Sequence, residues 1–180
     1  TVGQYTPLLS TAQGGVAVAA LVVSGAGVVA QTDPGVGIAA DEVSILGGAA
    51  LTHTPCTAAV TCSLDVTVTG SLFVDAASVI DVTGRGYLPG RTDGNTPPDP
   101  AQGPAGGSHG GLGRTGTSGG NTPAAYGEFA APDQPGGGGS QTAGGGLVWI
   151  TAGTAIVDGS IKADGGDVTG SSANSAGAGG

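Results

Sequence analysis

The chain of 180 residues has few of the amino acids that favour helices: it contains one lysine, two glutamates and no methionine. These three are among the common helix formers, so their scarcity argues against α-helical structure. Valine, isoleucine and threonine are abundant instead, and such side chains suit the pleated, half-buried surface of a sheet. The composition therefore predicts an all-β protein with essentially no α-helix.

Basic residues are also scarce: four face 13 acidic ones, for a net charge of −9. Nucleic acids and anionic membranes are bound through basic patches, so neither is an expected partner. The apolar stretch 16–30 is shorter than the roughly 20 residues that a membrane-spanning helix needs. It predicts two buried strands and no membrane insertion.

Cysteine is limited to Cys56 and Cys62. Together with the scarcity of lysine, this pair predicts a secreted, extracellular or cell-surface chain whose two cysteines form a disulfide closing one short turn. Free thiols are the alternative. A zinc site with His53 would supply only three of the four ligands that structural zinc requires. The chain begins at Thr1 and not at methionine, which predicts a processed protein or a fragment.

A repeat stands out against this background. Glycine followed by a small residue and then by β-formers recurs at Gly25, Gly48, Gly70 and Gly153. The first three glycines are almost evenly spaced, and the fourth follows at a similar interval once segment 84–146 is set aside. A period in the low twenties predicts stacked units that bury their apolar faces only against one another. We expect a short parallel β-helix (β-solenoid) of about four coils, each with three short strands.

Three segments follow from this division. Residues 1–83 would form a lead-in and solenoid coils, 84–146 a Gly/Pro-rich arm, and 147–180 the last coil with a glycine-rich tail. The arm holds most of the glycines and prolines of the chain. It is either a disordered linker or an ordered arm of extended, polyproline-like backbone. Disordered tracts are poor in aromatic residues, so order is favoured by Tyr87, Tyr126 and Phe129.

Two segments, 71–84 and 154–165, match each other best. A two-residue gap aligns Ile80 with Ile161 and Asp81 with Lys162, with the isoleucines inward and the charges outward. A cross-strand contact between Asp81 and Lys162 would be worth a few tenths of a kcal/mol to about 1 kcal/mol.

These stretches, VIDVTGRGY (79–87) and TAIVDGSIKADGG (154–166), together with GGSHGGLG (106–113), resemble the glycine-rich repeats of large bacterial surface proteins with a pectate-lyase-like right-handed parallel β-helix. The resemblance implies a secreted adhesive or structural protein. Pectate lyases use an Asp cluster with Ca²⁺ and a basic catalytic residue. No matching constellation occurs here, so no catalytic residue or cofactor carries over and an enzyme is not expected.

Other motifs have weak support. Asp158, Asp164 and Asp167 surround a glycine turn and resemble a weak Ca²⁺ site, but solvated turn aspartates are the favoured interpretation. Segment 106–110 matches Gly-x-Ser-x-Gly and 111–116 matches Gly-x-Gly-x-x-Gly. Both motifs need a strand–turn–helix context that the flanking sequence does not provide.

The leading hypothesis is a structural subunit that self-assembles into an extracellular filament, its partner being itself. A four-coil solenoid exposes strand edges at both ends, and stacking or exchange of the arm and tail would cover them. The residues expected at such contacts are Val16, Val18, Leu147, Trp149, Tyr87, Tyr126 and Phe129. The alternatives are a polysaccharide-binding or polysaccharide-cleaving module, with Arg85, Tyr87 and Tyr126 lining a groove, and an ice-binding array of outward threonines.

Overall fold

The computed structural model describes residues 5–7, 16–61, 63–97, 101–115, 119–128, 130–168 and 176–180. This part of the chain is all-β, apart from one short 3-10 turn, η1 (Asp93–Asn95), and it contains no α-helix. No helix in it is long and apolar enough to cross a membrane. The expected absence of α-helix is thus confirmed for these residues.

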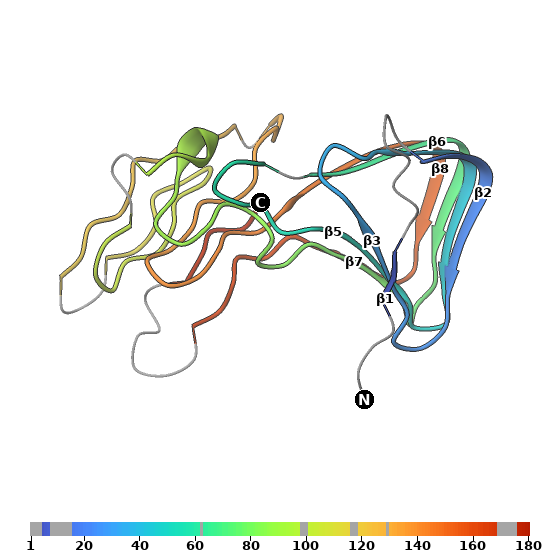
Figure 1. Ribbon diagram of the computed structural model, residues 1–180, viewed down its shortest axis with the longest axis horizontal. Helices are drawn as coiled ribbons and strands as arrows, with labels where there is room; N and C mark the ends of the chain where they lie inside the picture. Colours follow the sequence, from blue (N-terminus) through green and yellow to red (C-terminus); the bar gives the residue numbers. More distant parts are fainter. Residues whose placement is uncertain are drawn as a thin grey trace. The chain divides into compact units, whose positions relative to one another are not determined.

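The strands form two parallel sheets between which the chain alternates (Figure 1). One sheet has the order β1 (Tyr5–Pro7), β3 (Val29–Thr32), β5 (Ala50–His53), β7 (Val79–Asp81) and β9 (Ser160–Lys162). The other has the order β2 (Val16–Ser24), β4 (Ile38–Leu46), β6 (Ser63–Val74) and β8 (Leu147–Val157). Each round of the chain therefore adds one strand to each sheet.

Alternating apolar residues of the central strands form the core of the sheets. On β4, Ile38, Val43 and Ile45 are buried, while the residues between them are mostly exposed or half-buried. Their partners on β6 are Val66, Leu72 and Val74, which are also buried. Full burial of one such side chain stabilises the fold by about 1.5–3 kcal/mol. The two-residue period of a strand thus explains which face lies inward.

The predicted repeat is right at two glycines and wrong at two. Gly25 and Gly48 lie in the turns that lead to β3 and β5, with positive φ angles of 113° and 82°. Gly70 and Gly153 instead lie inside β6 and β8. Gly70 lies at a β-bulge opposite Asp41, where a Cβ would be 2.7 Å from the Asp41 carbonyl oxygen. A bulge glycine and a turn glycine look alike in the sequence.

The period itself also changes along the chain. Val29 pairs with Ala50, whereas Ala50 pairs with Val79, which is a longer step along the sequence. The longer loop between β5 and β6, together with the longer strand β6, accounts for most of the difference. Each round has two strands and not the three predicted, because segments expected to be separate strands are continuous. Strand β4 contains both Ile38 and Ile45, and β6 and β8 run through Gly70 and Gly153.

The register expected between the two best-matched segments is confirmed. Strand β7 pairs with β9 in parallel, with Ile80 opposite Ile161 and Asp81 opposite Lys162. The expected burial is right for Ile80 and wrong for Ile161, which is 45% exposed on the last strand of the sheet. The gap in the alignment falls in the turns, because residues 75–78 connect β6 to β7, whereas only 158 and 159 connect β8 to β9.

The chain divides into two compact units. The sheet unit comprises residues 1–54, 63–81 and 148–162, and it contains nearly all of the strands above. The arm unit comprises residues 55–62, 82–147 and 163–180. The arm predicted from the sequence thus forms a compact unit together with the tail.

Candidate functional site

The edge strands of the four-stranded sheet expose large apolar side chains. On β2, Val18 is 40% and Val22 is 59% exposed, and on β8, Trp149 is 51% and Ile156 is 49% exposed. Comparable valines and isoleucines on the central strands β4 and β6 are buried. The exposed apolar surface of this sheet is therefore concentrated at its two edges.

These edges also lack the usual protection against pairing with another chain. Neither β2 nor β8 contains a charged residue or a proline. The edge strands of the other sheet differ, since β1 contains Pro7 and β9 contains Lys162. Charges and prolines on edge strands prevent unwanted sheet extension. Among the described residues, no further strand pairs with the outer side of β2 or of β8.

The other residues expected at subunit contacts have different surroundings. The backbone of Val16 pairs with Ile38, and Leu147 is half-buried at the start of β8. Tyr87 is only 2% exposed, so it cannot line an outward polysaccharide groove. Phe129 lies outside the described residues.

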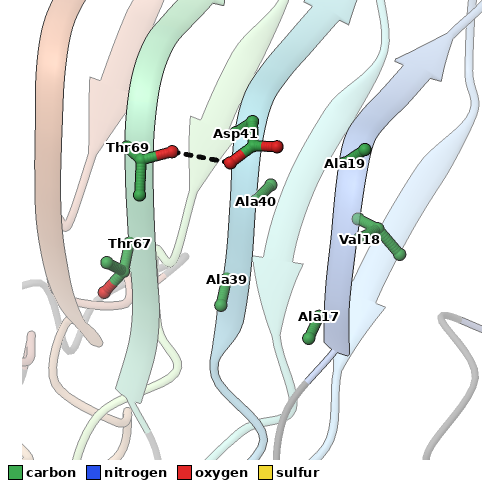
Figure 2. Close-up of a pocket in the computed structure, with 8 residues that line it drawn as sticks. All are labelled: Ala17, Val18, Ala19, Ala39, Ala40, Asp41, Thr67 and Thr69. Atoms are coloured by element: carbon green, nitrogen blue, oxygen red, sulfur yellow. Dashed lines mark hydrogen bonds between the residues drawn. The ribbon is translucent and has the colours of Figure 1, made fainter.

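A shallow hollow of about 410 Å³ lies over β2, β4 and β6 (Figure 2). Small side chains line it, and the Thr69 hydroxyl donates a hydrogen bond to the Asp41 carboxylate at 2.8 Å. At one level of this face the aligned residues are Ala17, Ala39 and Thr67. Threonine thus occurs on only one of the three strands that line this hollow.

A carboxylate connects successive turns of the sheet unit. Asp75 accepts hydrogen bonds from the Gly47 N–H at 2.6 Å and the Ala77 N–H at 3.1 Å. Hydrogen bonds from the Ser78 side chain and then from Gly47 lower the pKa of Asp75. This aspartate therefore holds the turn before β5 against the turn before β7.

Glycine-rich extended segments are hydrogen-bonded to one another throughout the arm unit. Segment 136–139 is bonded to three others: Gly136 N–H to Gly145 O at 2.8 Å, Tyr87 N–H to Gly136 O at 3.1 Å, and Ala178 N–H to Gly137 O at 2.9 Å. A strand in a flat sheet has only two hydrogen-bonded neighbours. The segments therefore form a three-dimensional bundle and not a sheet.

We call this arrangement of segments the glycine bundle. It is possible because the residues at its centre have no side chains. Residues 136–139 and 144–146 are buried glycines. A Cβ on Gly144 would lie less than 3.0 Å from the carbonyl oxygens of Gly136 and Gly137, and real Cβ atoms essentially never approach that closely. The sequence suggested an arm of extended backbone, but these contacts between distant glycines were not predicted.

Aromatic rings stabilise the arm unit. The rings of Tyr87 and Tyr126 stack with their centroids 6.0 Å apart, and His109 lies 5.1 Å from Tyr126. The Tyr126 hydroxyl donates to the Pro135 carbonyl at 2.8 Å. Burial, aided by the negative charge of Asp93, raises the pKa of Tyr87 to about 12, and burial also raises the pKa of Tyr126.

Raised tyrosine pKa values predict alkaline instability of the arm unit. The unfolded chain ionises near pH 10, and folding favours the protonated tyrosines, so their contribution is complete below pH 10 and lost as the pH rises towards 12. Each tyrosine should lower the free energy of unfolding by about 1.4 kcal/mol per pH unit in this range. Urea unfolding at pH 9, 10 and 11 measures this loss. Tyr87→Phe should lose less stability than the wild type, and equal slopes would contradict the assignment.

The predicted disulfide and calcium sites keep their status as predictions. Cys56 is buried and its N–H donates to Arg85 O at 3.0 Å, but Cys62 lies outside the described residues. Asp158 belongs to the sheet unit, whereas Asp164 and Asp167 belong to the arm unit. Among the described residues, no three His, Cys, Asp or Glu side chains form a group able to hold a metal ion.

Comparison with protein-family models, curated proteins and solved structures gave no match. The resemblance to glycine-rich bacterial surface repeats therefore stays a prediction.

Proposed function

We propose that the protein is a structural subunit, built as a short β-solenoid, that assembles with copies of itself into an extracellular filament. The observation that carries this proposal is the pair of edge strands β2 and β8, which lack charge and proline and expose apolar side chains. Unpaired edge strands present rows of free N–H and C=O groups to any incoming strand.

The parallel order of the sheet supports head-to-tail stacking. Strands β2 and β8 are its opposite edges, so β8 of one copy can pair with β2 of the next in the direction that the sheet already uses. Such a contact is heterologous and leaves a free edge at each end, and repeated contacts of this kind generate open filaments.

Charge placed on the edges should block assembly. We expect Val22→Lys and Ile156→Lys to abolish filaments, because each substitution places a charge on an edge strand that would pair with the next copy. Natural edge strands carry lysine to prevent such pairing. Sedimentation velocity and electron microscopy measure the outcome.

Leu112→Lys provides the matched control. Leu112 is 74% exposed but lies in the arm unit, outside every described strand. This variant should assemble like the wild type. A wild-type protein that stays monomeric at high concentration, or a Leu112→Lys variant that fails as completely as Val22→Lys, contradicts stacking through β2 and β8.

A further inference from the structure

The last described segment of the chain, Ala176–Gly180, is held in the arm unit by its backbone. Its N–H groups donate from Gly177 to Gly166 O at 3.2 Å, from Ala178 to Gly137 O at 2.9 Å and from Gly180 to Ala163 O at 2.8 Å. Its carbonyls also accept, from Gly107 N–H to Ala176 O at 3.0 Å and from Gly145 N–H to Ala178 O at 2.8 Å. We call the surrounding site the tail groove, which comprises Gly107, Gly137, Gly145, Ala163 and Gly166.

One side chain completes the set of contacts. His109 Nδ1 lies 3.0 Å from the Gly179 carbonyl oxygen. A carbonyl can only accept, so Nδ1 carries the hydrogen and donates. Backbone hydrogen bonds along the whole segment and one from a histidine thus hold it in the groove.

The tail groove requires glycine at some positions of the bound segment and tolerates alanine at others. A Cβ on Gly177 would lie less than 3.0 Å from the Ala143 carbonyl oxygen, and one on Gly180 would lie equally close to the Gly146 carbonyl oxygen. A Cβ on Gly179 would be 3.5 Å from its nearest neighbour, which is an ordinary contact. Ala176 and Ala178 already carry a Cβ. The second and fifth positions of the segment must therefore be glycine.

The walls of the tail groove obey the same rule. A Cβ on Gly165 would lie less than 3.0 Å from the carbonyl oxygens of Gly177 and Ala178, and one on Gly136 would lie as close to those of Ala178 and Gly179. Recognition is therefore reciprocal, since both the segment and the site that holds it lack side chains where they meet.

We propose that the tail groove is a peptide-binding site selective for an extended five-residue segment with glycine at its second and fifth positions, and that its occupant in the assembled protein is the segment 176–180 of a second copy. This inference rests on the proposed self-assembly and deepens it. A second copy offers the same five residues and hence the same hydrogen bonds, so exchange costs no contact. The segment from a second copy must compete with the segment 176–180 that is tethered to the groove's own chain. Stacking raises the local concentration of the second copy's segment and so favours its binding.

Peptide complementation tests the tail groove itself. In the full chain, Gly177→Ala should expel the segment but leave the groove intact. A labelled peptide Ala-Gly-Ala-Gly-Gly should then bind this variant at least about tenfold more tightly than the wild type, whose tethered segment competes. Fluorescence anisotropy measures the affinity. The peptide Ala-Ala-Ala-Gly-Gly should not bind, and Gly179→Ala should behave like the wild type.

Two outcomes overturn the groove. One is failure of the glycine peptide to bind both Gly177→Ala and a chain ending at residue 175, which covers the case in which the first variant does not fold. The other is equal binding of the two peptides, which would show that the site is not selective for glycine.

A pair of complementary variants tests whether segment 176–180 of a second copy occupies the tail groove. Gly177→Ala has a defective segment and an intact groove, whereas Gly165→Ala has an intact segment and a defective groove. Both carry Val22→Lys and Ile156→Lys, so that stacking through β2 and β8 does not contribute. A mixture should form a one-to-one complex in sedimentation velocity, and neither variant should dimerise alone.

The two proposals can fail separately. If the peptide binds but the mixture forms no complex, segment 176–180 serves only its own chain and the exchange is wrong. If the complex forms while the wild type makes no filaments, the stacking is wrong and the tail groove stands.

Discussion

Gly144→Ala is expected to unfold the arm unit. The Gly144 N–H donates to Tyr87 O at 2.9 Å and its carbonyl accepts from the Gly86 N–H at 2.7 Å, so the residue is fixed between segments. Its new Cβ would collide with the carbonyl oxygens of Gly136 and Gly137. Overpacking a core costs about 1–3 kcal/mol when side chains can yield. A backbone carbonyl has no rotamer to change, so we expect a loss of at least about 3 kcal/mol.

Amide hydrogen exchange measures this effect where it arises. The amides of Gly86, Tyr87 and Gly136, which donate to other segments of the bundle, should lose their protection. Gly111→Ala is the matched control, because Gly111 is exposed and a Cβ there would meet nothing within 4 Å. It should change stability by no more than about 0.5 kcal/mol. Retained protection in Gly144→Ala would show that the segments are not in close contact.

Ile45→Ala should be the most damaging truncation in the sheet unit. Ile45 is fully buried on the central strand β4, between Val23 of β2 and Val74 of β6. Removing a buried isoleucine to alanine costs about 2–5 kcal/mol, since the lost apolar contact and the remaining cavity both contribute.

Urea unfolding followed by circular dichroism measures this loss. Val22→Ala provides the comparison, because Val22 lies on edge strand β2 and is 59% exposed. It should cost at most about 0.5 kcal/mol. A cost below about 1 kcal/mol for Ile45→Ala would contradict the placement of this side chain in the core.

The sequence predicted the sheets where the evidence is local. Alternation of apolar residues identified the strands around Ile45 and Val68, and two similar segments were enough to align Ile80 with Ile161. Pairing of this kind depends on residues of two short stretches only, so their pattern contains the register.

Prediction failed where one residue type serves two purposes. Gly48 is required by a turn and Gly70 by a bulge, yet each is followed by β-forming residues, so a search for repeats treats them alike. The longer loop between β5 and β6 also makes the later round longer in sequence than the earlier one. A search that assumes a fixed period cannot detect such an insertion.

The glycine bundle was hidden for a different reason. Its hydrogen bonds join Tyr87, Gly136, Gly145 and Ala178, most of which are far apart in the chain. Runs such as Gly136–Gly139 are also typical of flexible linkers. The one available signal was the presence of several glycine runs together with aromatic residues, since linkers do not need aromatic side chains.

The scarcity of buried side chains in the glycine bundle has a thermodynamic consequence. Unfolding such a bundle exposes peptide groups more than apolar surface, and exposure of polar surface lowers the heat capacity whereas apolar exposure raises it. We therefore expect the heat-capacity change on unfolding to be small for the size of the arm unit, so its free energy of unfolding should rise almost linearly on cooling without passing through a maximum. The sheet unit, with its valine and isoleucine core, loses hydrophobic stabilisation on cooling. The arm unit is thus the part of the chain best suited to hold its structure in the cold.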